Sequence, residues 1–183
     1  NRQRAAVLSK FTKAKYLKSA EQIESIFDTA RWDSELASDM EELTVENIQV
    51  WMEFMAEQMG VELTPGNMDA IRAWSQKNAE YTAHYINKST ADQLLQSLLE
   101  ASDEDKQSAI KTIFELAIGV RALQLAYSRV HILSNFGIFN AAKLDGSGMT
   151  KTWMLGVTKN HRETHLKVAG ETIPVQEKFS NGL

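Results

Sequence analysis

The sequence contains no cysteine, and no stretch of it is a long apolar run. The missing cysteine excludes disulfide bonds and thiolate chemistry and fits a reducing compartment. A helix that spans a bilayer needs roughly 20 consecutive apolar residues, and the N-terminal residues lack the apolar segment of a secretory signal. The sequence also has no internal repeat and no low-complexity linker. We therefore expect neither membrane insertion nor secretion.

The patterns of several enzyme and cofactor classes are missing as well. Gly146 and Gly148 lack the Lys-Ser/Thr pair of a phosphate-binding loop, no serine has the context of a nucleophile elbow, and no paired Glu-x-x-His units suggest a di-iron bundle. His161 and His165 have the four-residue spacing of a zinc site, but Arg162 stands where the catalytic motif needs glutamate. The two histidines either bind a metal or form hydrogen bonds in a loop, and we favour the loop. The residues thus predict no enzyme, no cofactor and no metal.

The composition is that of an ordinary folded domain, with 43% apolar and 24% charged residues in a chain of 183. This length is enough for one good core or two small ones. The chain starts at Asn1 without methionine and stops within a loop-like phrase that ends at Leu183. We therefore expect a fragment of a longer protein.

Apolar residues recur three or four positions apart through most of the chain, which is the period of amphipathic helices. Thr64-Pro65 is a strong helix start, and Ser89-Thr90-Ala91-Asp92 and Ser102-Asp103-Glu104-Asp105 both resemble capping boxes. The spacing loosens at Asn135-Phe136-Gly137, and the turn at 145–148 ends the last helix. The ranges that we expect to be helical are 5–30, 35–59, 65–86, 89–99, 102–117 and 120–143.

The N-terminal third has segregated charge. Residues 1–20 carry six Lys/Arg and no acid, whereas 21–62 carry twelve Asp/Glu and only one base, Arg31. The basic segment either contacts DNA or another acidic partner, or it is a solvated helix face paired with its acidic neighbour, which we favour. We expect 1–62 to form a long-helix arm and 63–183 to form the body. The arm's candidate partner-binding residues are Phe11, Leu17, Met52 and Met55. A methionine stripe of this kind is more often part of a core, and for the methionines we favour that interpretation.

Two short β-prone runs lie near the C-terminus. In residues 151–158, Trp153, Leu155 and Val157 alternate with polar neighbours, as expected for a half-buried strand. Residues 171–175 form a second run, in which Pro174 indicates a strand end or a sheet edge. An isolated hairpin is marginally stable at best, so this unit needs the helices as support. The predicted fold class is α+β, with a mostly helical body of five to six helices and a small C-terminal hairpin-like unit.

The order of residues in this tail resembles the phage head morphogenesis family, also called Mu F-like or minor capsid proteins. The similarity extends from about Tyr127 to Leu183 and includes the phrases Thr150-Lys151-Thr152-Trp153, Arg162-Glu163-Thr164-His165 and Ile173-Pro174-Val175. The positions that carry the resemblance, as structural motif residues, are Arg129, Trp153, Arg162, His165, Gly170, Pro174 and Phe179.

The resemblance implies structural work in a virion. It suggests a minor capsid protein that associates with the portal during procapsid assembly, resides in the capsid interior and is oligomeric in the virion. During assembly such a protein would be in the host cytoplasm, and residues 1–62 would be its arm for portal binding or oligomerisation. The alternatives are a Mu F-like delivery module of a phage-derived toxin, and a helical nucleic-acid-binding protein that uses the basic N-terminus.

Overall fold

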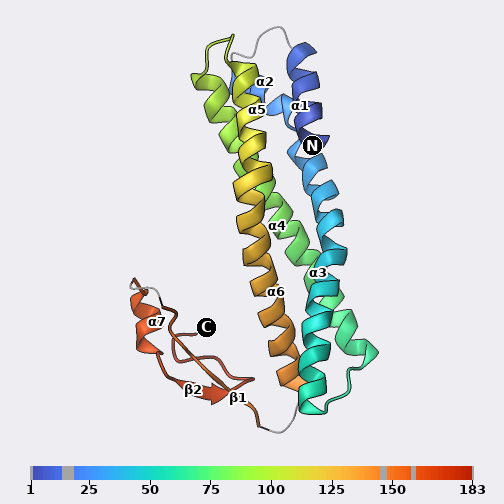
Figure 1. Ribbon diagram of the computed structural model, residues 1–183, viewed down its shortest axis with the longest axis vertical. Coiled ribbons are helices and arrows are strands. Elements are labelled where there is room, and N and C mark those ends of the chain that lie inside the picture. Colours follow the sequence, from blue (N-terminus) through green and yellow to red (C-terminus); the bar gives the residue numbers. More distant parts are fainter. Residues whose placement is uncertain (1, 14–18, 145–147, 158–159, 183) are drawn as a thin grey trace. The chain divides into compact units, whose positions relative to one another are not determined.

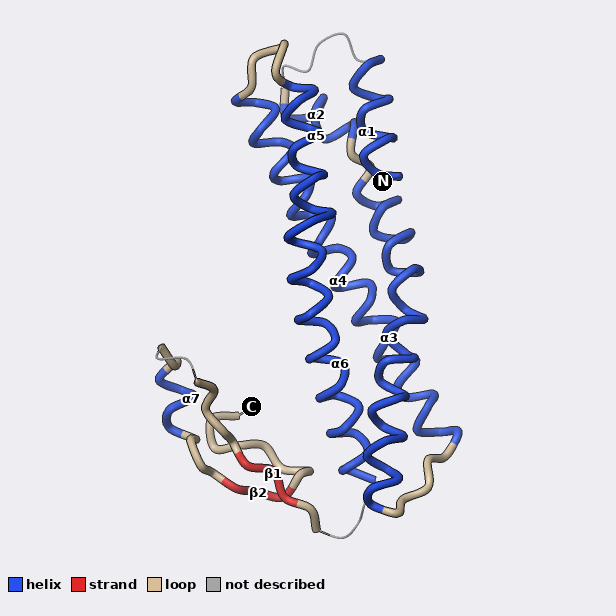
Figure 2. The backbone as a smooth tube through the Cα atoms, viewed as in Figure 1, coloured by secondary structure: helices blue, strands red, loops and turns tan. Residues whose placement is uncertain are grey.

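A computed structural model describes the chain except residues 1, 14–18, 145–147, 158–159 and 183. It is mostly helical, with one small antiparallel sheet of two strands in the described part of the chain (Figures 1 and 2). The predicted α+β class is therefore confirmed. The elements are α1 (Arg2–Lys13), α2 (Ala20–Ile26), α3 (Thr29–Met59), α4 (Pro65–Glu100), α5 (Lys106–Leu116), the π-helix η1 (Ala117–Arg121), α6 (Ala122–Leu144), β1 (Thr150–Thr152), α7 (Glu163–Lys167) and β2 (Thr172–Pro174).

The described residues form two compact units, one of 1–46 with 69–132 and the other of 47–68 with 133–183. In the first unit, α1, α2 and the start of α3 share one hydrophobic core with the end of α4 and with α5. The boundary that we expected near residue 62 is thus not where the compact units divide. None of the described helices has the length and apolar character needed to cross a membrane. The buried members of the shared core are Val7, Ile23, Ile26, Phe27, Trp32, Leu94, Leu98, Ile110, Ile113 and Phe114.

Helix starts follow local capping chemistry. α4 begins at Pro65 as predicted, and the Asn67 side chain accepts hydrogen bonds from both the backbone N–H and the hydroxyl of Thr64. The helix start expected at Ser102 is wrong, because Ser102 accepts a hydrogen bond from the backbone N–H of Asp105 within a turn, and α5 begins only at Lys106 without a side-chain cap. The single helix expected over 5–30 is wrong, because a capping box between Ser19 and Gln22 starts the separate helix α2.

The helix break expected at Ser89-Thr90-Ala91-Asp92 is also wrong. α4 runs through this segment to Glu100 because the hydroxyl of Thr90 bonds back to the carbonyl of Ile86, four residues earlier, at 2.9 Å. Lys88 and Asp92 pair on the helix surface instead, with 2.9 Å between nitrogen and oxygen. A threonine side chain can cap a new helix or bond within an existing one, and the surrounding packing decides which.

In the second unit, α6 does not loosen at Gly137. The helix continues through this glycine, which is buried against α3. A Cβ atom at Gly137 would lie 2.6 Å from the carbonyl oxygen of Ile48 and 3.1 Å from Cβ of Trp51. The glycine therefore permits a close approach of two helices, and Ile48 and Met52 are almost completely buried there.

Candidate functional site

The C-terminal sheet is short but well connected to its surroundings. Lys151 pairs with Ile173 in the antiparallel register of β1 and β2. Beyond β1, the backbone N–H of Trp153 donates to the carbonyl of Glu171, and the N–H of Gly170 donates to the carbonyl of Trp153, both at 2.9 Å. Gly170 has a φ of +80°, which favours glycine over residues with a Cβ atom. The chain can therefore turn back sharply from α7 into β2.

The burial pattern confirms the predicted alternation only in part. Trp153 and Leu155 are half-buried on the same side of the segment, as expected. Val157 is fully exposed, so its predicted place on that face is wrong. Backbone pairing continues only as far as Trp153, because the opposing chain turns at Gly170 and the residues before that turn form α7. Residue 158 lies outside the described residues.

An aromatic cluster fills the space between the sheet and α7. The indole of Trp153 makes edge-to-face contacts with the imidazole of His165, at 5.1 Å between ring centroids, and with the ring of Phe179, at 5.2 Å. Such contacts stabilise by roughly 0.5–1.5 kcal/mol beyond the area they bury. Val168 and Val175 are almost completely buried in the same unit. We call Trp153, His165 and Phe179 the tail cluster.

A lysine joins the tail cluster to α6. The ammonium group of Lys151 lies 5.0 Å from the ring centroid of Phe179 and 5.0 Å from that of Phe139, whose ring also contacts Lys143 at 4.3 Å. Cation–π contacts of this kind contribute roughly 0.5–1 kcal/mol at exposed sites. The sequence analysis missed this contact, because Lys151 and Phe139 are twelve residues apart and no spacing rule links them.

The last described residues are held by side-chain hydrogen bonds. The Glu171 carboxylate accepts from the backbone N–H of Ser180 at 3.0 Å and from its hydroxyl at 2.8 Å. The amide of Asn181 donates to the carbonyl of Thr164 at 3.1 Å, which ties this segment to α7. These bonds keep Phe179 in position against Trp153.

The structure brings some predicted motif residues together and leaves others apart. Trp153, His165, Gly170 and Phe179 meet in or beside the tail cluster, and Pro174 is the exposed last residue of β2. Arg162 is exposed and immediately precedes α7. In the described part of the chain, no group of three or more His, Cys, Asp or Glu residues could hold a metal ion.

Arg129 belongs to the other compact unit. Its Nη2 atom donates to the side-chain oxygen of Asn78 on α4. Burial lowers the pKa of Arg129 from its usual value, because the charged form loses hydration. The geometry identifies Arg129 as a link between α6 and α4.

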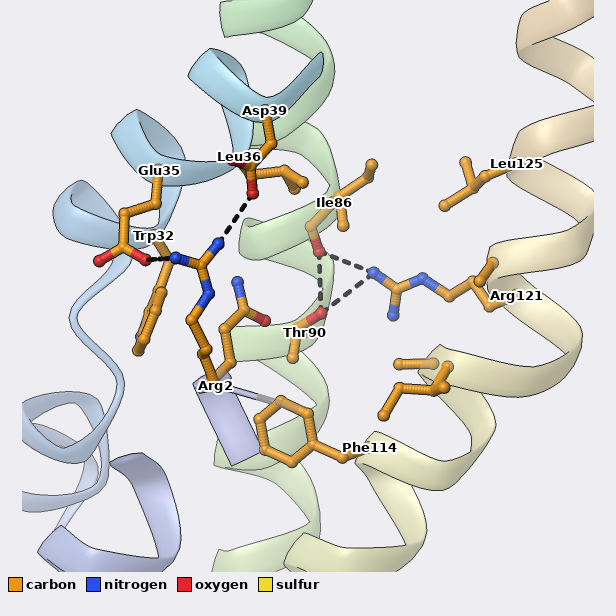
Figure 3. A pocket seen from close by; sticks show the side chains of 14 residues that line it. Arg2, Trp32, Glu35, Leu36, Asp39, Ile86, Thr90, Phe114, Arg121 and Leu125 are labelled. Carbon is orange, nitrogen blue, oxygen red and sulfur yellow. Dashed lines mark hydrogen bonds and ion pairs between the residues drawn. The ribbon is translucent and has the colours of Figure 1, made fainter. Parts of the chain in front are cut away.

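A pocket of about 450 Å³ in the first unit lies between α3, α4 and the segment formed by η1 and α6, and is also lined by α1 and α5 (Figure 3). Arg2 forms ion pairs with Glu35 at 3.5 Å and Asp39 at 2.9 Å. Arg121 donates from Nη2 to the carbonyl of Ile86 at 2.7 Å and to the hydroxyl of Thr90 at 3.1 Å. Both guanidinium groups thus bind protein oxygens, but Nη1 of Arg121 is buried without a hydrogen-bond partner among the described residues.

The predicted partner-binding residues lie mostly in packed positions. Phe11 packs against the shared core of the first unit, Met52 is buried where α3 meets α6, and Met55 is half-buried. Leu17 lies outside the described residues. The core interpretation therefore holds for Met52, because its side chain is not accessible to a partner.

Comparison with known protein families, with curated proteins and with solved structures gives no match for this chain.

Proposed function

We propose that this chain is a structural minor capsid protein of a tailed phage, of the head morphogenesis class, which associates with the portal during procapsid assembly. The observation that carries the proposal is the tail cluster. The resemblance to the Mu F-like family rests largely on residues from Thr150 to Phe179, and among them Trp153 contacts both His165 and Phe179 directly. These residues are far apart in the sequence but pack together, so they belong to one folded module. Members of a family are expected to share such a module.

The chemistry of the cluster supports an assembly role over catalysis. His165 contacts the ring of Trp153, and Lys151 lies over two aromatic rings, so these groups contribute to packing. The two-stranded sheet leaves each strand with an unpaired edge among the described residues. Such an edge can add a strand from another subunit, which is a common mode of protein assembly.

The charge pairing disfavours the nucleic-acid alternative. Arg2 pairs with Glu35 and Asp39, and Arg4 lies 3.7 Å from Glu115. Lys and Arg side chains that bind DNA displace counterions from its phosphates, and Arg2 and Arg4 would first have to give up their contacts with carboxylates. From the sequence we favoured pairing of the basic segment with the acidic segment that follows it. The ion pairs of Arg2 with Glu35 and Asp39 confirm this for Arg2.

The test is binding to the portal protein encoded in the same genome. We expect the two proteins to co-purify after co-expression, and purified particles to contain this chain by mass spectrometry. Trp153→Ala should weaken portal binding at least about tenfold, since it removes both edge-to-face contacts of the cluster. Met154→Ala is the matched control, because the side chain of Met154 is 83% exposed beside Trp153.

A deletion of the N-terminal residues would be a poor test of portal binding. Residues 7–32 contribute to the shared hydrophobic core of the first unit, so their removal would disrupt folding itself. Point substitutions avoid this problem. Absence of the chain from particles, together with no binding of the unaltered protein to the portal, would refute the proposal.

A further inference from the structure

The pocket of the first unit, which we call the Arg121 pocket, has the size and lining of a small-molecule site. Its volume of about 450 Å³ falls within the range of about 300–1,000 Å³ that is usual for such sites. Small-molecule sites typically combine an apolar lining with a few polar groups that orient the ligand. The larger apolar side chains that line this pocket are Trp32, Leu36, Ile86, Phe114, Ile118 and Leu125.

The Arg121 pocket reaches from the surface into the core of the first unit. Trp32 and Phe114, which line it, are almost completely buried members of the shared hydrophobic core. Arg2 and Asp39, which also line it, have exposed side chains. A ligand could therefore enter from solvent and bury an apolar group against core side chains.

Arg121 brings an unused hydrogen-bond donor to this pocket. Its Nη2 atom donates to the carbonyl of Ile86 at 2.7 Å and to the hydroxyl of Thr90 at 3.1 Å. Its Nη1 atom is buried and has no hydrogen-bond partner among the residues that the structure describes. A buried donor without an acceptor costs free energy. An oxygen atom of a bound ligand would remove this cost.

The charges that line the pocket favour an anion near Arg121. The guanidinium group is always charged in proteins, and both oxygens that its Nη2 atom binds are neutral. The acids that line the pocket, Glu35 and Asp39, are paired with Arg2 at 3.5 and 2.9 Å. Figure 3 shows these three residues on the opposite side of the pocket from Arg121, with side chains of α4 between them.

The backbone at Arg121 supplies a second, independent observation. Residues Ala117–Arg121 form the π-helix η1, and Ala117, Ile118 and Arg121 from this segment line the pocket. Single π turns within α-helices are rare and frequently occur at functional sites. The unused donor therefore lies on the type of helical turn that often marks a binding site.

We propose that the Arg121 pocket binds a small amphipathic carboxylate. Its carboxylate accepts a hydrogen bond from Nη1 of Arg121, and its apolar body contacts the lining formed by side chains such as Trp32 and Phe114. Hydrogen bonds between a guanidinium and a carboxylate are roughly twice as strong as those between neutral groups. This inference goes beyond the assembly role proposed above and does not depend on the phage assignment.

Isothermal titration calorimetry with octanoate and octanol tests the class of ligand. The two probes share an alkyl chain and differ in the head group. An apolar hollow alone would prefer octanol, because burial of an unpaired carboxylate costs more than burial of a hydroxyl. We expect octanoate to bind with a dissociation constant below about 1 mM, and at least about tenfold more tightly than octanol.

Substitution of Arg121 tests the proposed contact. Arg121→Met removes the donor and keeps a long side chain, so it should weaken octanoate binding at least about tenfold and change octanol binding little. Arg129→Met is the matched control, because Arg129 is also a partly buried arginine that binds α4 but does not line the pocket. Both probes should bind this control as they bind the unaltered chain. Circular dichroism checks that each variant is folded.

A second variant tests the pocket without removing Arg121. Ala122 lines the pocket and is exposed, so Ala122→Phe should fold normally while its ring occupies part of the hollow. We expect it to weaken the binding of both probes at least about tenfold, and it decides alone if Arg121→Met does not fold. Octanoate that does not bind, or binds no more tightly than octanol, would overturn the proposal. Unchanged octanoate binding by either folded variant would do the same.

Discussion

Gly137 offers the sharpest test of how the second unit is packed. In Gly137→Ala, the new Cβ would lie 2.6 Å from the carbonyl oxygen of Ile48 and 3.2 Å from the backbone N of Met52. Both atoms belong to the backbone of α3 and cannot rotate away, so the helices must separate by about 1 Å to restore a normal contact of roughly 3.5 Å. Overpacking of this kind typically costs about 1–3 kcal/mol.

The higher helix propensity of alanine opposes this packing cost and must be subtracted from it. Alanine is favoured over glycine in a helix interior by about 1 kcal/mol. The separation of the helices also loosens Ile48, Met52 and Ala141, all of them at most 2% exposed, which places the packing cost toward the upper end of its range. We therefore expect a net loss of about 1–2 kcal/mol in the free energy of unfolding, and a melting temperature lower by about 3–6 °C.

Gly119→Ala is the matched control for this substitution. Gly119 also lies in a helical segment, but a Cβ there would meet nothing within 4 Å. The gain in helix propensity from glycine to alanine then acts alone. We therefore expect the free energy of unfolding to stay the same or to rise by at most about 1 kcal/mol. Urea denaturation followed by circular dichroism measures both variants. If Gly137→Ala is as stable as the unaltered protein, the close approach of α3 and α6 is wrong.

Three further predictions concern buried or constrained groups. Asn87→Ala should cost about 2 kcal/mol in urea denaturation, because the fully buried Asn87 binds both Gln3 and Asp33 and its loss leaves their polar groups without that partner. Gly170→Ala should destabilise the tail by about 1 kcal/mol because of its positive φ, with a change in tryptophan fluorescence as the readout. Glu171→Gln should speed amide hydrogen exchange of Ser180, since a neutral amide accepts these bonds more weakly than a carboxylate.

Patterns with a fixed period were the most predictable part of this chain. The alternation that placed Trp153 and Leu155 on one half-buried side needs only the geometry of an extended backbone, and the structure confirms it. The start of α4 at Pro65 follows from local chemistry in the same way. Val157 departs from the pattern because the partner strand ends before reaching it, and strand length is set by pairing.

The features that the sequence did not reveal depend on contacts between distant residues. Gly137 was expected to loosen a helix, as isolated glycines often do, and only the proximity of α3 explains why it lies within one. The membership of Trp153, His165 and Phe179 in one motif was inferred from resemblance, but their contacts and the position of Lys151 over two rings required coordinates. The capping box between Ser19 and Gln22 was visible in the sequence. It was missed because the helical spacing of apolar residues continues across it, which predicted a single helix.

The polarity of α6 is partly inverted relative to an ordinary surface helix. A surface helix normally buries its apolar stripe and exposes its charges, yet here Arg121 and Arg129 bond inward while Leu123 and Tyr127 face solvent. A buried guanidinium group stabilises little by itself, since its hydrogen bonds mainly offset lost hydration. The inward side therefore fixes the orientation of α6 against α4, and the outward side remains available for further burial of apolar surface.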